Sequence, residues 1–384
     1  MNSWEADDYL QWYDAYDRFL KEKGFDKAFP TVDDLTRSMG NVSFYYQGRI
    51  IENIRISNTV DAYAVNGWES MKLENHSGIV DNYRFPKGDP EVMARYNAPL
   101  YLAVKMNRKV VSTGDTTLVD TYIVNEKNLK GSYILNLVAK DESGNVVASH
   151  KERVTVKGGN DYGQCLQSGW AFIPKSKGYT RIEASLLKGK TELVKGDDLL
   201  FAVELNTKGI TTRGSVADTT GALVNFLRGV GMEVPVYKGG TPEGDYLLVG
   251  AYEPTQWGSG MSDIMEWVYK GHTLIIVDNP ERWAEFLADK EVLDYRGSKI
   301  LGKSWYGGNF FNREHPIFMN LPANSAFNWE YQCFATYNRR RIGLRCFNGE
   351  TLVGCVSDHK KEVYSALQVI PAGSGKVIIT TLDI

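Results

Sequence analysis

The spacing of hydrophobic residues predicts two helices at the start of the chain and a strand after them. From Ser3 to Lys23 apolar and aromatic residues recur with the helical period, and Gly24 follows where the helix would end. A second helix is predicted after Pro30, and Ala62–Val65 then has the composition of a buried strand. Helices that lead into a buried strand are typical of a parallel α/β barrel, so residues 1–98 are predicted to be the last part of one.

From Ala98 onward the hydrophobic period changes from that of a helix to that of a strand. Short runs alternate apolar and polar residues and are separated by polar turns. The runs are Leu100–Met106, Thr117–Val124, Ser132–Ala139, Val146–Val156, Gly169–Ile173, Thr180–Leu187 and Leu199–Leu205. This pattern predicts an immunoglobulin-like β-sandwich over residues 99–208. We interpret it as a spacer that braces the barrel; the alternative is a carbohydrate-binding module.

Residues 209–384 alternate strand-like and helix-like segments. Predicted strands at Glu233–Tyr237, Tyr246–Val249 and Thr273–Val277 are separated by predicted helices, of which one begins at Ser262 and another at Pro280. The pattern predicts an open, doubly wound α/β sheet of flavodoxin type. The predicted fold class is therefore multidomain, α/β plus all-β: the end of a (β/α)8 barrel, an immunoglobulin-like β-sandwich and a flavodoxin-like domain.

Composition and charge narrow the function classes. Of 384 residues, 43% are hydrophobic and 24% are charged, as in ordinary globular proteins. A net charge of −3 gives no electrostatic reason to expect nucleic acid or an anionic membrane as partner. The start of the chain lacks a signal peptide, and no apolar run approaches the roughly 20 residues that span a bilayer. Four cysteines form no Cys-x-x-Cys pair, so no metal or other cofactor is predicted, and whether they pair is left open.

The turn after Ala62–Val65 carries the candidate site. Asn66, Trp68, Glu69, Glu74, Asn75 and His76 lie within eleven residues. A flat indole beside hydrogen-bonding groups suits a sugar, because the indole stacks on the pyranose ring and the polar groups bind its hydroxyls. The alternative is the end of a strand with a core tryptophan and solvated acids.

Several motifs in residues 30–105 resemble the closing segment of the catalytic barrel in glycoside hydrolase family 2, especially its β-galactosidase-like members. The motifs are Asp33–Gly40, Tyr46–Asn53, Asn66–Ser70, Leu73–Asp81 and Arg84–Pro90. The resemblance implies that Ala62–Val65 is the eighth barrel strand and that Trp68 is a sugar-stacking platform. It also implies that Glu69, Asn75 and His76 lie near the same rim, so these four residues are the expected substrate-binding residues.

The resemblance also shows what this chain lacks. Family members use two glutamates, at the ends of the fourth and seventh strands, and both would precede Ser3. Glu69 and Glu74 are a poor substitute, because an acid and a nucleophile normally come from different strands. No catalytic residue is therefore assigned. We expect the C-terminal part of a retaining glycosidase for β-linked sugars, inactive alone, or alternatively a non-catalytic carbohydrate-binding or assembly protein.

The last domain resembles the glutamine-amidotransferase-like domain of some carbohydrate-active enzymes. An amidotransferase needs a cysteine on a sharp strand-to-helix turn and a histidine to activate it. The only close pair here is Cys355 and His359. We expect the domain to be catalytically silent and to serve packing or homo-oligomer formation, with a cysteine-dependent hydrolase as a third alternative. A periplasmic or extracellular location would follow if the full-length relative carries a signal peptide.

Overall fold

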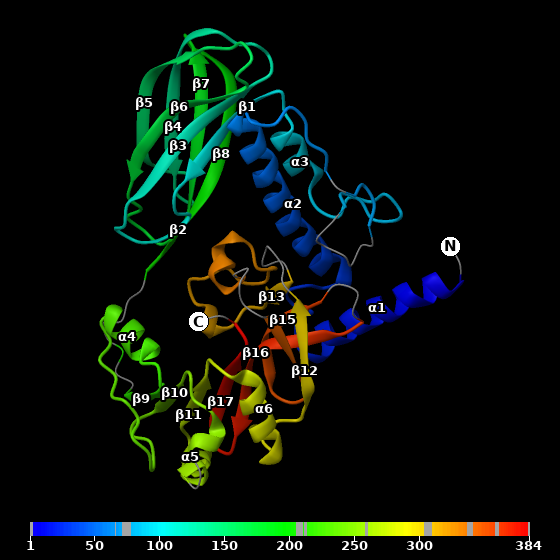
Figure 1. Ribbon diagram of the computed structural model, residues 1–384, viewed down its shortest axis with the longest axis vertical. Helices are drawn as coiled ribbons and strands as arrows, with labels where there is room; N and C mark the ends of the chain where they lie inside the picture. The colour runs from blue at the N-terminus through cyan, green and yellow to red at the C-terminus, as the bar shows by residue number, and fades with distance from the viewer. Residues whose placement is uncertain are drawn as a thin grey trace. The chain divides into compact units, whose positions relative to one another are not determined.

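A computed structural model describes residues 3–65, 67–70, 78–204, 210, 213–257, 260–302, 309–335, 341–357 and 361–382. The chain divides into two compact units (Figure 1). The first comprises Met1–Met39, Asn206–Pro316 and Ala323–Ile384, and the second comprises Gly40–Leu205 and Ile317–Pro322. The boundary falls within one helix, α2 (Val32–Ser57).

The second unit is built on two facing β-sheets. The smaller sheet has the order β1 (Leu100–Met106), β3 (Thr117–Asn125), β6 (Gly163–Phe172). The larger sheet has the order β2 (Val110–Ser112), β8 (Thr191–Val203), β7 (Gly178–Lys188), β4 (Gly131–Lys140), β5 (Val146–Val156). Buried and exposed residues alternate along β4 and β7, as their sequence pattern predicts, and the buried ones form an apolar core between the sheets.

The outer face of the smaller sheet is covered by helices. Tyr101 and Ala103 of β1 pack against Phe44 and Ile51 of α2 and against Met93 of α3 (Pro90–Tyr96). An ionic network lies in the same unit. Arg49 Nη1 is 2.9 Å from Glu52 Oε1 and 3.4 Å from Asp198 Oδ2, so it joins α2 to β8. Burial raises the pKa of Glu52, while Arg49 and Lys105 act in the opposite direction.

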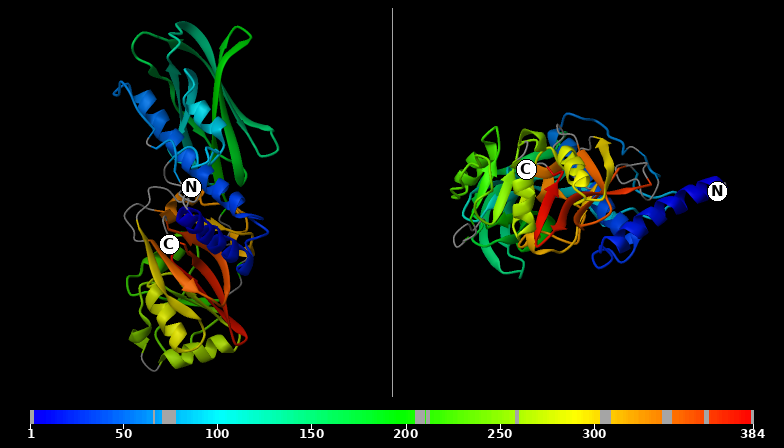
Figure 2. Two further views of the ribbon diagram at one scale, coloured as in Figure 1. Left: turned by 90° about the vertical axis from the view of Figure 1, so that its right-hand side faces the viewer. Right: turned by 90° about the horizontal axis from the view of Figure 1, so that it is seen from below.

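The first unit contains a sheet of nine strands curled into a half-barrel (Figure 2). Strands β9 (Gly214–Ala217), β10 (Tyr246–Val249), β11 (Thr273–Ile276) and β17 (Gly375–Thr380) are parallel neighbours. Val236 pairs with Val216 on the other side of β9, where the sequence predicts a strand. Helices α4 (Ala222–Gly229), α5 (Gly260–Tyr269) and α6 (Pro280–Asp289) alternate with these strands.

Antiparallel strands extend this sheet beyond β17. They are β12 (Tyr295–Gly302), β13 (Phe310–Asn312), β14 (Arg341–Cys346), β15 (Glu350–Val356) and β16 (Val363–Ala372). Short 3₁₀ turns occur at η1 (Pro254–Trp257), η2 (Pro316–Phe318) and η3 (Trp329–Ala335). The long hydrogen-bonded pairing of β16 with β17 joins the antiparallel part of the sheet to the parallel part.

An aromatic cluster attaches the N-terminal segment of the chain to this sheet. The first helix, α1 (Ser3–Glu22), contributes Phe19, and the turns after it contribute Phe25 and Phe29. All three rings contact Phe311 of β13 edge to face, with ring centroids 6.1, 5.2 and 5.8 Å away, respectively. Gly354 of β15 makes room for the cluster, because a Cβ there would lie 2.4 Å from the Phe311 ring.

At the level of fold class, the observed mixture of helix and sheet, mostly β, agrees with the predicted α/β plus all-β organisation. The assignments to a barrel end, an immunoglobulin-like sandwich and a flavodoxin-like domain, and their boundaries, stay predictions. One expected element is wrong: residues 62–65 form no strand, and Ala62, Tyr63 and Ala64 are exposed. A strand of a parallel sheet needs paired neighbours, and none of the described strands pairs with this segment.

Replacing Phe311 with Ala should destabilise the first unit by about 3–5 kcal/mol, because the ring is fully buried and its loss leaves a cavity under three phenylalanines. Hydrogen exchange of the β15 and β16 amides in increasing urea would measure this. Phe226→Ala is the matched control, since Phe226 is 60% exposed and its removal should change stability by less than about 0.5 kcal/mol. Equal effects of the two changes would contradict the role given to the cluster.

Candidate functional site

Trp68 and Glu69 lie on a loop in which backbone hydrogen bonds join two described segments, residues 67–70 and 78–89. The amides of Ile79 and Val80 both donate to the carbonyl of Trp68 at 3.0 Å, and the amide of Ser70 donates back to Val80 at 3.1 Å. The Lys87 amide donates to Ile79 at 3.0 Å, so a third stretch of backbone joins the same structure. Ile79 packs against the apolar cluster beneath α2, which anchors the loop to the second unit.

Asp81 organises the tip of this loop. Its side chain is buried, and Oδ1 accepts hydrogen bonds from the amides of Tyr83 and Phe85, both at 2.9 Å. The Phe85 carbonyl accepts a bond from the Asp81 amide at 2.9 Å, which closes the turn. Arg84, at the centre of the turn, has a positive φ of 67°. An aspartate that accepts hydrogen bonds from following amides is a common way to fix such a turn.

The loop is fitted closely to helix α2. A Cβ at Gly40 would lie 1.8 Å from the Lys87 carbonyl oxygen, so only glycine allows this approach. Next to it, Asn41 Oδ1 accepts a hydrogen bond from the Asp89 amide at 2.7 Å. Lys87 itself is buried, and its Nζ donates to Ser70 Oγ at 2.5 Å.

Three large aromatic side chains on this rigid loop are exposed to solvent. Trp68 is 60% exposed, Tyr83 63% and Phe85 66%. Glu69 Oε1 accepts a hydrogen bond from Arg84 Nε at 3.1 Å, so a polar pair lies on the same loop. We call Trp68, Glu69, Tyr83, Arg84 and Phe85 the aromatic loop surface. It combines apolar ring faces with charged hydrogen-bonding groups, which is the chemistry that a sugar ring requires.

The structure describes two of the four expected substrate-binding residues. Trp68 and Glu69 are both exposed on the same loop, whereas Asn75 and His76, together with Glu74, lie outside the described residues. Sequence reasoning did not single out Tyr83 and Phe85. Phe85 lies within the motif Arg84–Pro90, which resembles the family 2 barrel, and Tyr83 lies just before it. Aromatic residues in a polar turn follow no regular period, so the sequence does not show which of them are exposed.

The described part of this loop has no pair of carboxyl groups arranged for hydrolysis. Glu69 forms an ion pair with Arg84, and Asp81 is buried with its oxygen accepting two amides. A retaining glycosidase places its two carboxyl groups about 5–5.5 Å apart on opposite sides of the bond that is cleaved.

Two of the three cysteines of the first unit, Cys346 and Cys355, are buried and are therefore poor nucleophiles. Burial raises the pKa of Cys346 to about 12, and it raises the pKa of Cys355 further still. Burial also raises the pKa of Cys333. The reactive form of cysteine is the thiolate, so a raised pKa suppresses reactivity at neutral pH. His359, the expected partner of Cys355, lies outside the described residues.

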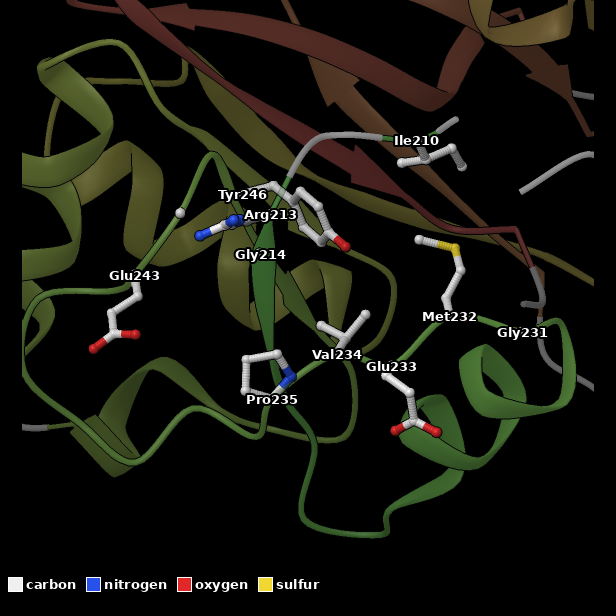
Figure 3. A pocket seen from close by; sticks show the side chains of 11 residues that line it. Ile210, Arg213, Gly214, Gly231, Met232, Glu233, Val234, Pro235, Glu243 and Tyr246 are labelled. Atoms are coloured by element: carbon white, nitrogen blue, oxygen red, sulfur yellow. The ribbon is translucent and has the colours of Figure 1, made fainter. Parts of the chain in front are cut away.

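A separate hollow of about 660 Å³ lies in the first unit (Figure 3). Arg213, Gly214 and Tyr246 line it at the amino ends of β9 and β10, and Met232 and Val234 form part of its wall. Ligands of open α/β sheets bind at the carboxyl ends of the strands. This hollow lies at the amino ends of the strands, so its position in the sheet does not indicate a ligand site.

At the carboxyl end of β9, the Asp218 side chain caps the start of helix α4. Asp218 Oδ2 accepts a hydrogen bond from the Leu223 amide at 2.9 Å, and Oδ1 accepts from the Thr220 amide at 3.0 Å. A carboxylate already occupies the position at which a bound phosphate would be held. Among the described residues, no group of three or more His, Cys, Asp or Glu side chains is arranged to hold a metal ion. None of the described helices is long and apolar enough to cross a membrane.

No family model matches the chain, and no curated protein matches it. Among solved structures, a β-glucuronidase of glycoside hydrolase family 2 is 14% identical with a TM-score of 0.22, over 27% of this chain and 11% of that one. A family 2 member from Bacteroides cellulosilyticus is 13% identical with a TM-score of 0.22, over 47% and 24%. The CARDB domain of a Pyrococcus furiosus protein is 14% identical with a TM-score of 0.20, over 27% and 87%.

Family 2 hydrolases are thus among the structural neighbours, weakly and over part of the chain. This chain spans between 11% and 24% of the length of the two family 2 enzymes above. Likenesses of this size establish neither membership of the family nor an activity.

Replacing Asp81 with Ala should loosen the aromatic loop surface, because the amides of Tyr83 and Phe85 both lose their acceptor. Their hydrogen exchange should accelerate by about 10-fold or more, as expected for about 1–3 kcal/mol of lost stabilisation. Asp81→Asn keeps one acceptor oxygen and should have a smaller effect. Asp61→Ala, at an exposed position before the loop, is the control and should leave both amides unchanged.

Proposed function

We propose that this chain is the C-terminal part of a glycoside hydrolase that acts on β-linked sugars by a retaining two-carboxylate mechanism, with the catalytic glutamates missing from this chain. Its own contribution would be a sugar-binding surface. The observation that supports this role is the exposure of Trp68, Tyr83 and Phe85 on one hydrogen-bonded loop beside the Glu69–Arg84 pair. Trp68 would stack on the sugar ring, and Glu69 would accept hydrogen bonds from its hydroxyls.

Hydrogen bonds hold the loop that carries these side chains before any ligand binds. Side chains that are exposed singly are common on protein surfaces, but three large aromatics on one loop are unusual without a ligand or partner. The backbone of Trp68 is held by two amides, and those of Tyr83 and Phe85 are held by Asp81. Binding to a surface that is already ordered loses little further conformational entropy. Asn75 and His76 would complete the polar rim under this proposal.

The remaining parts of the chain would support the barrel. Residues 99–208 would form the immunoglobulin-like spacer, and residues 209–384 would form a silent domain used for packing or homo-oligomer formation. The buried, high-pKa cysteines support the silent interpretation of the last domain, because they lack thiolate character at neutral pH.

A non-catalytic carbohydrate-binding or assembly protein is the second candidate. The observation that favours it is that Glu69, Asp81 and Asp89, the three acids of the described loop segments, are occupied by Arg84 and by backbone amides. Both candidates require the aromatic loop surface to bind sugar. In the first candidate this surface works beside the two catalytic glutamates of the hydrolase, and in the second it binds sugar without them.

Trp68→Ala should reduce the affinity of the chain for β-linked oligosaccharides by at least about 10-fold, because the stacking face is removed. NMR titration of the loop amides would measure this. Phe226→Ala removes an equally exposed aromatic from α4 and should leave binding unchanged.

The chain alone should release no aglycone from aryl β-glycosides. If the chain did release aglycone and Trp68→Ala left that release unchanged, two statements would be contradicted. One is that the catalytic glutamates are missing from this chain, and the other is that the sugar site includes Trp68. Absence of sugar binding by the unaltered chain would contradict both candidate functions.

A further inference from the structure

A cluster of charged side chains lies between helix α2 and the sandwich of the second unit. Arg49 and Glu52 belong to α2, and Asp198 belongs to β8. Lys105, on β1, and Lys109, just after it, form ion pairs with these two acids. We call these five residues the α2 charge cluster. All five side chains are mostly buried, and that of Glu52 has no exposed surface.

The α2 charge cluster contains three cations and two carboxylates. Lys109 Nζ lies 2.5 Å from Asp198 Oδ1. Arg49 Nη1 lies 2.9 Å from Glu52 Oε1 and 3.4 Å from Asp198 Oδ2, so this guanidinium uses both acids. Lys105 Nζ lies 3.6 Å from Glu52 Oε1, which is the longest of these contacts. Lys105 is therefore the cation that the two acids hold least closely.

One cation in excess is unfavourable in a buried cluster, because little water is present to solvate the charge. A guanidinium does not lose its proton in a protein, whereas a buried lysine readily does. Burial, and after it the charge of Arg49, lower the pKa of Lys105, while Glu52 acts in the opposite direction. Loss of the Lys105 proton leaves two cations for two carboxylates and so balances the cluster.

The other neighbours of Lys105 are compatible with an uncharged amine. Asp120 of β3 lies opposite Lys105 in the strand pair, but Asp120 Oδ1 already accepts hydrogen bonds from Ser168 Oγ and from the Gly169 amide, both at 2.7 Å. Lys105 Nζ donates a hydrogen bond to Asn53 Oδ1, a neutral acceptor. A neutral amine keeps N–H donors for this bond, so losing a proton does not cost Lys105 its contact with α2.

We propose that Lys105 is a nucleophilic lysine that forms an imine with small aldehydes. A neutral amine has the lone pair that attacks a carbonyl carbon, and burial or a neighbouring cation makes lysines reactive in this way. The bond from Nζ to the carbonyl carbon forms, the carbon–oxygen bonds break, and the oxygen leaves as water with the two amine protons. Only 26% of the Lys105 side chain is exposed, so a small aldehyde reaches Nζ more readily than a bulky one.

Lys105 is not part of the aromatic loop surface, so this reaction is independent of the proposed function. It gives a covalent chemistry to the sandwich, which we interpreted from the sequence as a spacer. Side chains from α2, β1 and β8 together create the excess charge, and these elements are far apart in the sequence.

The test is reductive labelling of the full chain with glycolaldehyde and sodium cyanoborohydride at pH 7, followed by peptide mass spectrometry. Cyanoborohydride converts each imine into a stable secondary amine, so the labelled fraction of every lysine is measured in one sample. Lys105 should be labelled at least about 10-fold faster than Lys127, an exposed lysine of the same unit, because each unit of pKa changes the neutral fraction of an amine about 10-fold. Lys109, which contacts Asp198, should be labelled more slowly than Lys127.

Two variants change the charge balance in opposite directions. Arg49→Gln leaves two cations for two acids, so Lys105 should keep its proton and be labelled at least about 10-fold more slowly. Glu52→Gln removes an acid, so Lys105 should be labelled at an equal or higher rate. Arg153→Gln, at an exposed position of β5, is the matched control for the loss of an arginine and should leave Lys105 labelling unchanged.

Labelling of Lys105 that is no faster than that of Lys127 would overturn the proposal, and so would an unchanged rate in folded Arg49→Gln. Amide spectra that match those of the unaltered chain, with unchanged labelling of Lys127, show that a variant is folded. The unaltered chain gives a further readout that needs no variant. As the pH is raised, labelling of Lys105 should level off at a lower pH than labelling of Lys127, and coincident profiles would contradict a neutral Lys105.

Discussion

The candidate site depends on one close approach of backbone to backbone, that of Lys87 to Gly40 of helix α2. The distance available there excludes any side chain at residue 40, and the neighbouring Asn41 receives the Asp89 amide. With the loop fixed at this end, the hydrogen bonds of Trp68 and Asp81 hold the remainder. Steric fit to a helix and the packing of Ile79 against an apolar cluster together hold the loop on which three aromatic rings are exposed.

The sequence predicted strands well where one face of the strand is buried, because apolar and polar residues then alternate. The seven predicted runs of the sandwich overlap β1, β3, β4, β5, β6, β7 and β8, because alternation is strict wherever two sheets enclose a core. Strand β2 was not predicted, since three residues are too few for a period to be recognised. The segment at Val236 was predicted as a strand and pairs with Val216 only at that one bridge.

The same reasoning was less successful at the candidate site. Ala62–Val65 has the composition of a buried strand, yet pairing partners decide whether such a segment is buried, and composition does not reveal them. Trp68 and Glu69 were identified from residue types, whereas Tyr83 and Phe85 reach the same surface through a turn fixed by Asp81. The ion pair between Arg95 of α3 and Asp197 of β8 joins residues about 100 positions apart in the sequence, so no local pattern predicts it.

The aromatic cluster around Phe311 has a consequence for synthesis of the chain on the ribosome. Helix α1 emerges first, but the strands β13 and β15 that bury Phe19, Phe25 and Phe29 are among the later parts of the sequence. At the usual rates of translation, roughly 290 residues separate Phe19 from Phe311 by about 15–60 s. During that time residues 40–205 of the second unit are synthesised, while Phe19, Phe25 and Phe29 still lack the ring of Phe311. The fold therefore creates an interval in which a chaperone, rather than the protein itself, would cover the aromatic residues of this first segment.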